Sequence, residues 1–172
     1  DLVVEAFLCQ KLLVGALLYD LAILDRGSPE AGNRIPGLAF INGIVRLGGA
    51  NDGGAVLQNT EEAFIEAVRH GSGGIETDVR VTKDGVLVVN HNDEAVFEDG
   101  TELLVAEATY EELTAKPLKN EFTDTKLYVC TFERYLEICR DGNMVCFIEF
   151  KGSFPDEKIN EAFILADKVC KI

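Results

Sequence analysis

Two pairs of charged residues have the spacing that places both members of a pair on one face of a β-strand. Glu76 and Asp78 form the first pair, and Glu149 and Lys151 form the second. Side chains alternate along a strand, so each pair projects from one side of its strand. Carboxylates that share a face of an interior strand are costly to bury unless they are neutralised, and a divalent cation is the usual means. The three carboxylates are therefore candidate metal ligands.

A histidine is the third kind of group in this set. His91 follows the apolar run Val86–Asn90, at the tip of an expected strand. Together these residues predict a metal-assisted phosphoryl site, in which the metal screens the phosphate charge, His91 moves protons and Lys151 stabilises developing negative charge. Each group also has a structural alternative. The carboxylates can line the wet face of an edge strand, the histidine can be a hydrogen-bonding residue, and Glu149–Lys151 can be a surface ion pair.

The candidate residues fall in a stretch that alternates between strand and helix patterns. Strands are expected over residues 40–47, 75–81, 86–90 and 144–150, and helices are expected after the N-cap residues Thr60, Thr109 and Thr131 and from Pro155 onward. This alternation predicts an α/β fold of βα units with a largely parallel sheet. Such folds bind ligands at the carboxyl ends of their strands, which is where the candidate residues lie.

The chain before this stretch has a different character. Residues 1–25 are strongly apolar and predict an N-terminal helix, residues 26–39 are rich in Gly, Ser and Pro and predict a linker, and residues 40–172 predict one βα domain. The longest charge-free run in the apolar segment, Leu12–Tyr19, is far shorter than the roughly 20 residues that span a bilayer. The expected helix packs against the core or a partner. Contact with a membrane surface through residues 2–24 is the alternative, although its polar face is not basic.

Composition narrows the classes of function. The 172 residues are 47% hydrophobic and 27% charged, which excludes global disorder. Sixteen basic against 30 acidic residues give a net charge of −14, which argues against non-specific binding of nucleic acid. Five cysteines without a Cys-x-x-Cys pair favour a reducing compartment. The expected location is therefore cytoplasmic or membrane-associated.

Several separate motifs, in the same order, resemble the glycerophosphodiester phosphodiesterase family between about Ile44 and Lys151. They read Gln58-Asn59-Thr60-Glu61-Glu62-Ala63-Phe64, Gly74-Ile75-Glu76-Thr77-Asp78-Val79, Thr82-Lys83-Asp84-Gly85-Val86-Leu87-Val88-Val89, His91 and Thr109-Tyr110-Glu111-Glu112-Leu113. The resemblance implies a TIM-barrel (β/α)8 fold. It also implies hydrolysis of a small-molecule glycerophosphodiester to glycerol phosphate and an alcohol, with bound Ca²⁺ or Mg²⁺.

The resemblance also implies roles for single residues. The family's Glu-x-Asp pair binds the metal and corresponds to Glu76 and Asp78, and the Glu of its later strand corresponds to Glu149, followed by Lys151. The histidine after the Val-Val strand is one half of the acid/base pair and corresponds to His91.

Two positions depart from the family's motifs. The family opens with His-Arg-Gly or His-Ala-Gly-Gly, where this chain reads Val45-Arg46-Leu47-Gly48-Gly49. The first catalytic histidine is thus replaced, by Arg46 on the better alignment or by Leu47. Arg46 can bind a phosphate but cannot take up a proton at neutral pH. The family's Glu-Asn-Thr reads Gln58-Asn59-Thr60, which removes a carboxylate near the site.

Length is the other departure. The stretch from Ile44 to the end of the chain is about half of the roughly 250 residues in a complete barrel. A half-barrel leaves two open sheet edges, which favour a homo-oligomer or pairing with another chain. Two functions are therefore expected as alternatives. One is metal-dependent hydrolysis, and the other is a degenerate module that binds a phosphodiester or metal without turnover, or that serves assembly.

Overall fold

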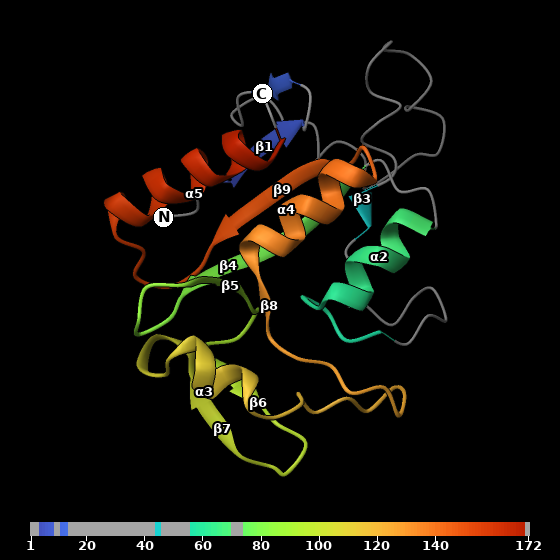
Figure 1. Ribbon diagram of the computed structural model, residues 1–172, viewed down its shortest axis with the longest axis vertical. Coiled ribbons are helices and arrows are strands. Elements are labelled where there is room, and N and C mark those ends of the chain that lie inside the picture. Colours follow the sequence, from blue (N-terminus) through green and yellow to red (C-terminus); the bar gives the residue numbers. More distant parts are fainter. Residues whose placement is uncertain (1–3, 9–10, 14–43, 46–55, 70–73, 171–172) are drawn as a thin grey trace, which may run out of the picture.

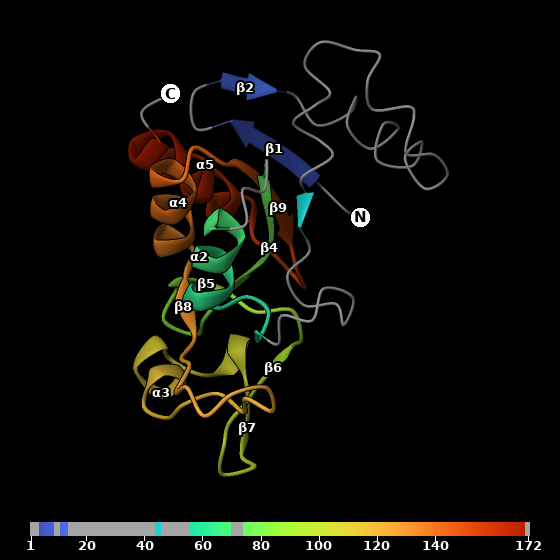
Figure 2. The same cartoon turned by 90° about the vertical axis from the view of Figure 1, so that its right-hand side faces the viewer.

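The computed structural model describes residues 4–8, 11–13, 44–45, 56–69 and 74–170. These residues form a mixed α/β arrangement, in which helices α2, α4 and α5 lie along one side of a seven-stranded sheet (Figure 1). A small lobe with α3 and a two-stranded sheet lies beyond one end of the large sheet (Figure 2).

The large sheet is centred on β4 (Gly74–Val81). Its strands in spatial order are β2 (Lys11–Leu13), β1 (Val4–Leu8), β9 (Val145–Phe150), β4, β5 (Leu87–Val89) and β8 (Cys130–Thr131), with β3 (Ile44–Val45) also paired to β4. β4 runs parallel to β9 along one side. Along its other side it pairs first with β3, in parallel, and then with β5, antiparallel.

The sheet is less parallel than its sequence pattern predicted. Only the β3–β4 and β4–β9 pairings are parallel among the described strands, because β5 pairs antiparallel with both β4 and β8, and β1 pairs antiparallel with β9. The reason lies in the Thr82–Gly85 turn, which is far too short for the crossover that joins parallel strands. Gly85 has φ +83°, a conformation that glycine adopts without strain, and Thr82 N donates to Val86 O at 3.0 Å. β4 and β5 are therefore a hairpin.

The helices begin where the sequence predicted them. They are α2 (Glu61–Arg69), α3 (Tyr110–Thr114), α4 (Phe132–Asp141) and α5 (Asp156–Cys170). The Thr131 hydroxyl accepts from Arg134 N, and Thr109 forms a reciprocal capping box with Glu112. These caps confirm the expected starts of α3 and α4.

The helix predicted over residues 1–25 is wrong wherever the structure describes that segment, because Val4–Leu8 and Lys11–Leu13 are strands. A short apolar run is ambiguous between helix and strand. Here β1 pairs with the outer edge of β9, so the partner that decides the conformation lies more than a hundred residues away in the sequence. Residues 14–25 and the expected linker at 26–39 lie outside the described residues, and the domain boundaries stay predictions. Within the described residues, no helix has the length and hydropathy needed to cross a bilayer.

The small lobe carries strands that the sequence pattern did not predict. β6 (Glu94–Val96) and β7 (Glu102–Leu104) form an antiparallel pair, followed by a 3-10 turn, η3 (Val105–Glu107), and α3. A second apolar cluster lies beneath them and includes Phe97. The strands are only three residues long, so they are too short to show a clear alternation.

The main core lies between the large sheet and its helices, and Tyr135 of α4 is fully buried there. Its hydroxyl donates to Ile75 O at 2.7 Å. Tyr135→Phe should lower the free energy of unfolding by about 1–3 kcal/mol, because it leaves a buried carbonyl without this donor. Urea unfolding at unchanged m-value measures the loss. Tyr128→Phe is the control, since Tyr128 is exposed and its change should stay within about 0.5 kcal/mol. Equal stability of the two variants would contradict the assignment.

Candidate active site

The three predicted carboxylates come together on β4 and β9. These neighbouring strands are in a register that sets Asp78 opposite Glu149. One carboxylate oxygen from each of Glu76, Asp78 and Glu149 lies within 4.8 Å of the others. Ile75 and Val79 alternate with them along β4 and pack into the core under the helices. The carboxylates therefore occupy the sheet face that is turned away from the helices, and Asp78 and Glu149 are buried.

Lys151 supplies a positive charge to this cluster. Its Nζ lies 2.7 Å from Glu149 Oε1 and 3.3 Å from Asp78 Oδ1. Partial burial alone lowers the pKa of Lys151, but the hydrogen bond to Glu149 and the nearby Asp78 charge outweigh it, so the net shift is upward. The lysine therefore stays charged at neutral pH. Its ammonium pairs with two of the three grouped carboxylates.

Asn59 orients Asp78, a role that the sequence pattern did not reveal. Its Nδ2 donates to Asp78 Oδ2 at 2.9 Å, and its Oδ1 accepts from Asp78 N at 3.1 Å and from Thr77 Oγ1 at 2.8 Å. Asn59 has φ 55°, a left-handed conformation that asparagine tolerates better than most residues. The sequence feature that could have indicated this role is the Gln58-Asn59-Thr60 motif, in which an Asn directly precedes a helix cap.

The surroundings of the second Asp78 oxygen, Oδ1, indicate whether the cluster fits a metal ion. Asp78 Oδ1 is buried and accepts no hydrogen bond within the described part of the chain, although Lys151 Nζ lies at ion-pair distance. A buried carboxylate oxygen without a hydrogen bond is rare and calls for an explanation. Divalent Ca²⁺ and Mg²⁺ take such oxygens as ligands. The donor set of Glu76, Asp78 and Glu149 therefore fits a divalent cation.

His91 reaches the same end of β4 by a route that was not expected. Because β5 returns antiparallel, Asn90 N donates to Asp78 O at 2.9 Å, and His91 follows directly. The His91 ring is exposed, and its Nδ1 lies 2.9 Å from Asn92 Oδ1. Together with Gln58 and Asn90 it lines a cavity of about 110 Å³. His91 thus lies in a loop that follows the residue paired with Asp78, and it is not a member of the carboxylate group.

The remaining predicted site residue, Arg46, lies outside the described residues. Gln58, at the family's Glu position, is exposed and contributes to the same cavity as His91.

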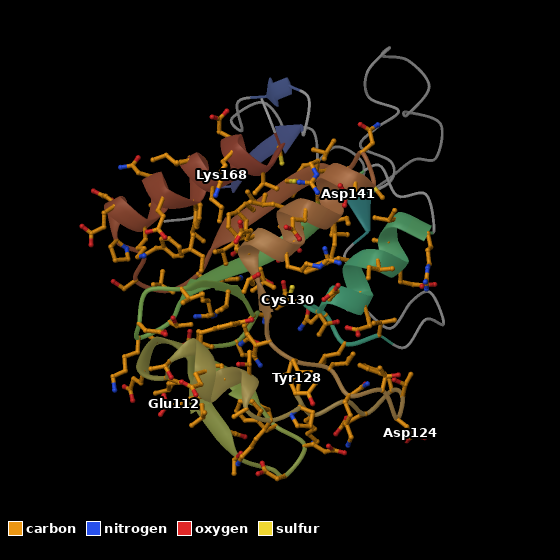
Figure 3. The ribbon with its side chains drawn as sticks, in the orientation of Figure 1. Glu112, Asp124, Tyr128, Cys130, Asp141 and Lys168 are labelled. Carbon is orange, nitrogen blue, oxygen red and sulfur yellow. The ribbon has the colours of Figure 1, made fainter. Side chains whose placement is uncertain are left out.

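Cys130 of β8 is a nucleophile by residue type, and Figure 3 shows it at the start of α4, beside the segment that leads to the small lobe. Burial, and next the charge of Glu61, raise the pKa of the Cys130 thiol to about 12. Because the thiolate is the reactive form, Cys130 is not a catalytic nucleophile at neutral pH.

This pKa makes a prediction about thiol labelling. From 9.0 to about 12, the shift leaves native Cys130 with about a thousandfold less thiolate at pH 8 than the unfolded chain has. Iodoacetamide labelling followed by site-resolved mass spectrometry should therefore modify Cys130 much more slowly in the native protein than in urea. Equal rates in the two conditions would contradict the buried position. The thiol of the unfolded chain ionises at a lower pH than the buried thiol does. The stability that the neutral Cys130 side chain gives the native protein is therefore lost as the pH rises from about 9 towards 12.

The parallel strands β3, β4 and β9, with helices on one face and carboxylates on the other, have the arrangement of part of a (β/α)8 barrel. Solved structures agree with this class. A glycerophosphodiester phosphodiesterase from Agrobacterium tumefaciens is similar with a TM-score of 0.55 at 29% identity, over 63% of this chain and 47% of that chain. One from Parabacteroides distasonis is similar with a TM-score of 0.54 at 27% identity, over 74% of this chain and 51% of that chain.

The family model described as the glycerophosphoryl diester phosphodiesterase family matches residues 49–170, and the chain belongs to that family. Among curated relatives, the glycerophosphodiester phosphodiesterase of Bacillus altitudinis is 32% identical over 123 residues, covering 65% of this chain and 50% of the relative. Glycerophosphodiester phosphodiesterase 1 of Homo sapiens is 29% identical over 119 residues, covering 65% of this chain and 34% of the relative. The chain thus spans half of the first relative's length and a third of the second's.

Proposed function

We propose that this chain carries the cation-binding part of a phosphodiesterase site and takes part in metal-dependent hydrolysis of glycerophosphodiesters to glycerol phosphate and an alcohol. The observation that carries the proposal is the carboxylate cluster, in which three ligand oxygens lie within 4.8 Å and a buried Asp78 oxygen lacks a hydrogen bond among the described residues. Family membership and the names of the relatives support the substrate class.

In this proposal Glu76, Asp78 and Glu149 hold the cation, and Asn59 keeps the Asp78 carboxylate in place by donating to Oδ2. When bound, Ca²⁺ or Mg²⁺ screens the charge of the phosphate and polarises a phosphoryl oxygen. Lys151 remains protonated beside the carboxylates, where its ammonium attracts a substrate oxygen.

Proton transfer falls to His91 in the same proposal. The alkoxide that leaves the phosphorus needs a proton, and a protonated imidazole can donate one. Arg46, at the position of the family's first histidine, is proposed to bind the phosphate, because its guanidinium keeps its proton.

The direct test is release of glycerol phosphate from glycerophosphocholine by the chain with Ca²⁺ or Mg²⁺ present. We expect release that a chelator abolishes and that either cation restores. Release that continues unchanged in chelator would contradict metal dependence.

One observation favours a second candidate, which is a module that binds a cation and a phosphodiester without turnover. The family's first catalytic histidine is replaced at Arg46, and loss of one partner in proton transfer typically costs about 10²–10⁴-fold in rate. The two candidates separate cleanly, because the second predicts calorimetric binding of Ca²⁺ with no product above the blank.

The cellular location and the binding partners of the chain are also proposed, in general terms. We retain a cytoplasmic or membrane-associated location, contact of residues 2–24 with a membrane surface, and self-association through a sheet edge. Vesicle co-sedimentation tests the membrane contact, and sedimentation velocity tests self-association. In the structure β1 and β2 extend the sheet beyond β9, so the outermost described strands, through which an oligomer would pair, are β2 and β8.

A further inference from the structure

Arg80 lies on β4 two residues beyond Asp78, on the same strand face as the carboxylates, and it is buried. All three of its guanidinium nitrogens donate to one loop, residues 90–93. Nε donates to Asn90 O at 2.9 Å, Nη2 donates to His91 O at 2.7 Å, and Nη1 donates to Asp93 Oδ1 at 2.6 Å.

Further contacts stabilise this loop and surround the Arg80 guanidinium. Asn90 Nδ2 donates to Asn92 O at 2.8 Å and to Glu94 O at 3.0 Å, so the loop is also bonded to itself. Gly152, in the loop after β9, lies over the guanidinium, and a Cβ built at this glycine would lie 3.5 Å from Nη1. The guanidinium therefore lies between the loops that follow β5 and β9.

The backbone bonds matter because the His91 side chain has little packing of its own. Its ring is exposed, and its hydrogen bond is to the adjacent Asn92 of the same loop, so the position of the ring follows from the backbone that Arg80 holds. A planar guanidinium donates to two adjacent carbonyls and a carboxylate in one fixed geometry, which a lysine ammonium does not reproduce.

We propose that Arg80 is a positioning residue for His91, which it fixes against the strand that carries the cation ligands. This inference rests on the proposed function. Proton transfer needs the acid within hydrogen-bond reach of the reacting oxygen, and a displacement of about 1 Å costs as much as 100-fold in rate.

The kinetic test compares Arg80→Gln and Arg80→Lys with the wild-type chain. Both variants should lower kcat by about 10- to 100-fold and leave KM and calorimetric Ca²⁺ affinity within about twofold. Arg140→Gln is the matched control, because Arg140 is a surface arginine that pairs with the adjacent Asp141, and it should leave kcat unchanged. Full activity of Arg80→Lys would overturn the proposal, since charge alone would then suffice.

A double-variant cycle separates positioning from general damage to the fold. If Arg80 acts through His91, Arg80→Gln should cause no further loss of kcat in a His91→Ala background. Losses that multiply would overturn the proposal, because they would show that Arg80 acts independently of the histidine.

A second measurement does not depend on turnover. The ¹⁵N order parameters of His91 and Asn92 should fall from about 0.85 to below about 0.6 in Arg80→Gln, and they should stay high in Arg140→Gln. Unchanged order parameters in a folded Arg80→Gln chain would overturn the proposal. If this variant fails to fold, Asp93→Asn takes its place and should give a smaller fall in the same parameters, whereas no fall would count against the proposal. If the wild type hydrolyses nothing, the proposed function fails and the order parameters alone decide the role of Arg80.

Discussion

His91→Ala should lower kcat for glycerophosphodiester hydrolysis by about 10²–10⁴-fold while Ca²⁺ binding is retained. The reason is which side chains of the site can exchange a proton at neutral pH. Lys151 is held in its charged form by its carboxylate partners, and an arginine such as Arg46 keeps its proton at neutral pH. His91 is the histidine of the described residues that directly follows Asn90, whose backbone N donates to Asp78 O.

The measurement is the initial rate of glycerol phosphate release at saturating Ca²⁺, with calorimetric Ca²⁺ binding as evidence of an intact cation site. Wild-type and variant rates that both match the no-enzyme blank would contradict hydrolysis. The second candidate, a module that binds without turnover, would then be favoured. A variant as fast as the wild type would instead show that another group moves the proton.

Asp78→Asn should weaken binding of the divalent cation on the order of 100-fold, because affinity for Ca²⁺ follows the charge and number of the ligands. Asp78 is the central ligand in the proposed site, since Asn59 orients one of its oxygens and the other lacks a hydrogen bond among the described residues. The amide has nearly the same shape, so the variant removes the charge with little change in packing.

Thermal unfolding gives a second readout of this prediction. A cation at 100 times its Kd stabilises the native protein by about 2.7 kcal/mol, which raises Tm by several degrees in a chain of this size. At the same cation concentration a site weakened 100-fold gives only about 0.4 kcal/mol, so most of that rise should be lost in Asp78→Asn. The control is Asp99→Asn, which makes the same chemical change at an exposed carboxylate of the small lobe, paired with Lys116. An equal Ca²⁺-dependent rise in both variants would contradict the assigned site.

Local rules predicted the parts of this structure that depend on local chemistry. The threonine caps of α3 and α4 are confirmed, because capping involves residues three positions apart. The alternation along β4 and β9 likewise put Glu76, Asp78 and Glu149 on one face, and the strand register then brought them together.

The parts that depend on distant partners were not predictable in the same way. The strand conformation of Val4–Leu8 depends on pairing with β9, whereas the direction of β5 follows from a local turn that the Asp84-Gly85 pair favours. The roles of Asn59 and Arg80 depend on hydrogen bonds to residues 10 to 19 positions away, and their residue types alone carry no such information.

The exchange of partners along one edge of β4, from β3 to β5, has a consequence for substitutions in the site. Residues 82–129 leave the parallel strands as an excursion that carries His91, whereas β4 and β9 hold the carboxylates through their own ladder of backbone bonds. The groups proposed for cation binding and for proton transfer thus lie on separate segments, which Arg80 of β4 links through its bonds to residues 90–93. Under the proposed function, substitutions within the excursion would alter proton transfer and leave the proposed cation ligands in place.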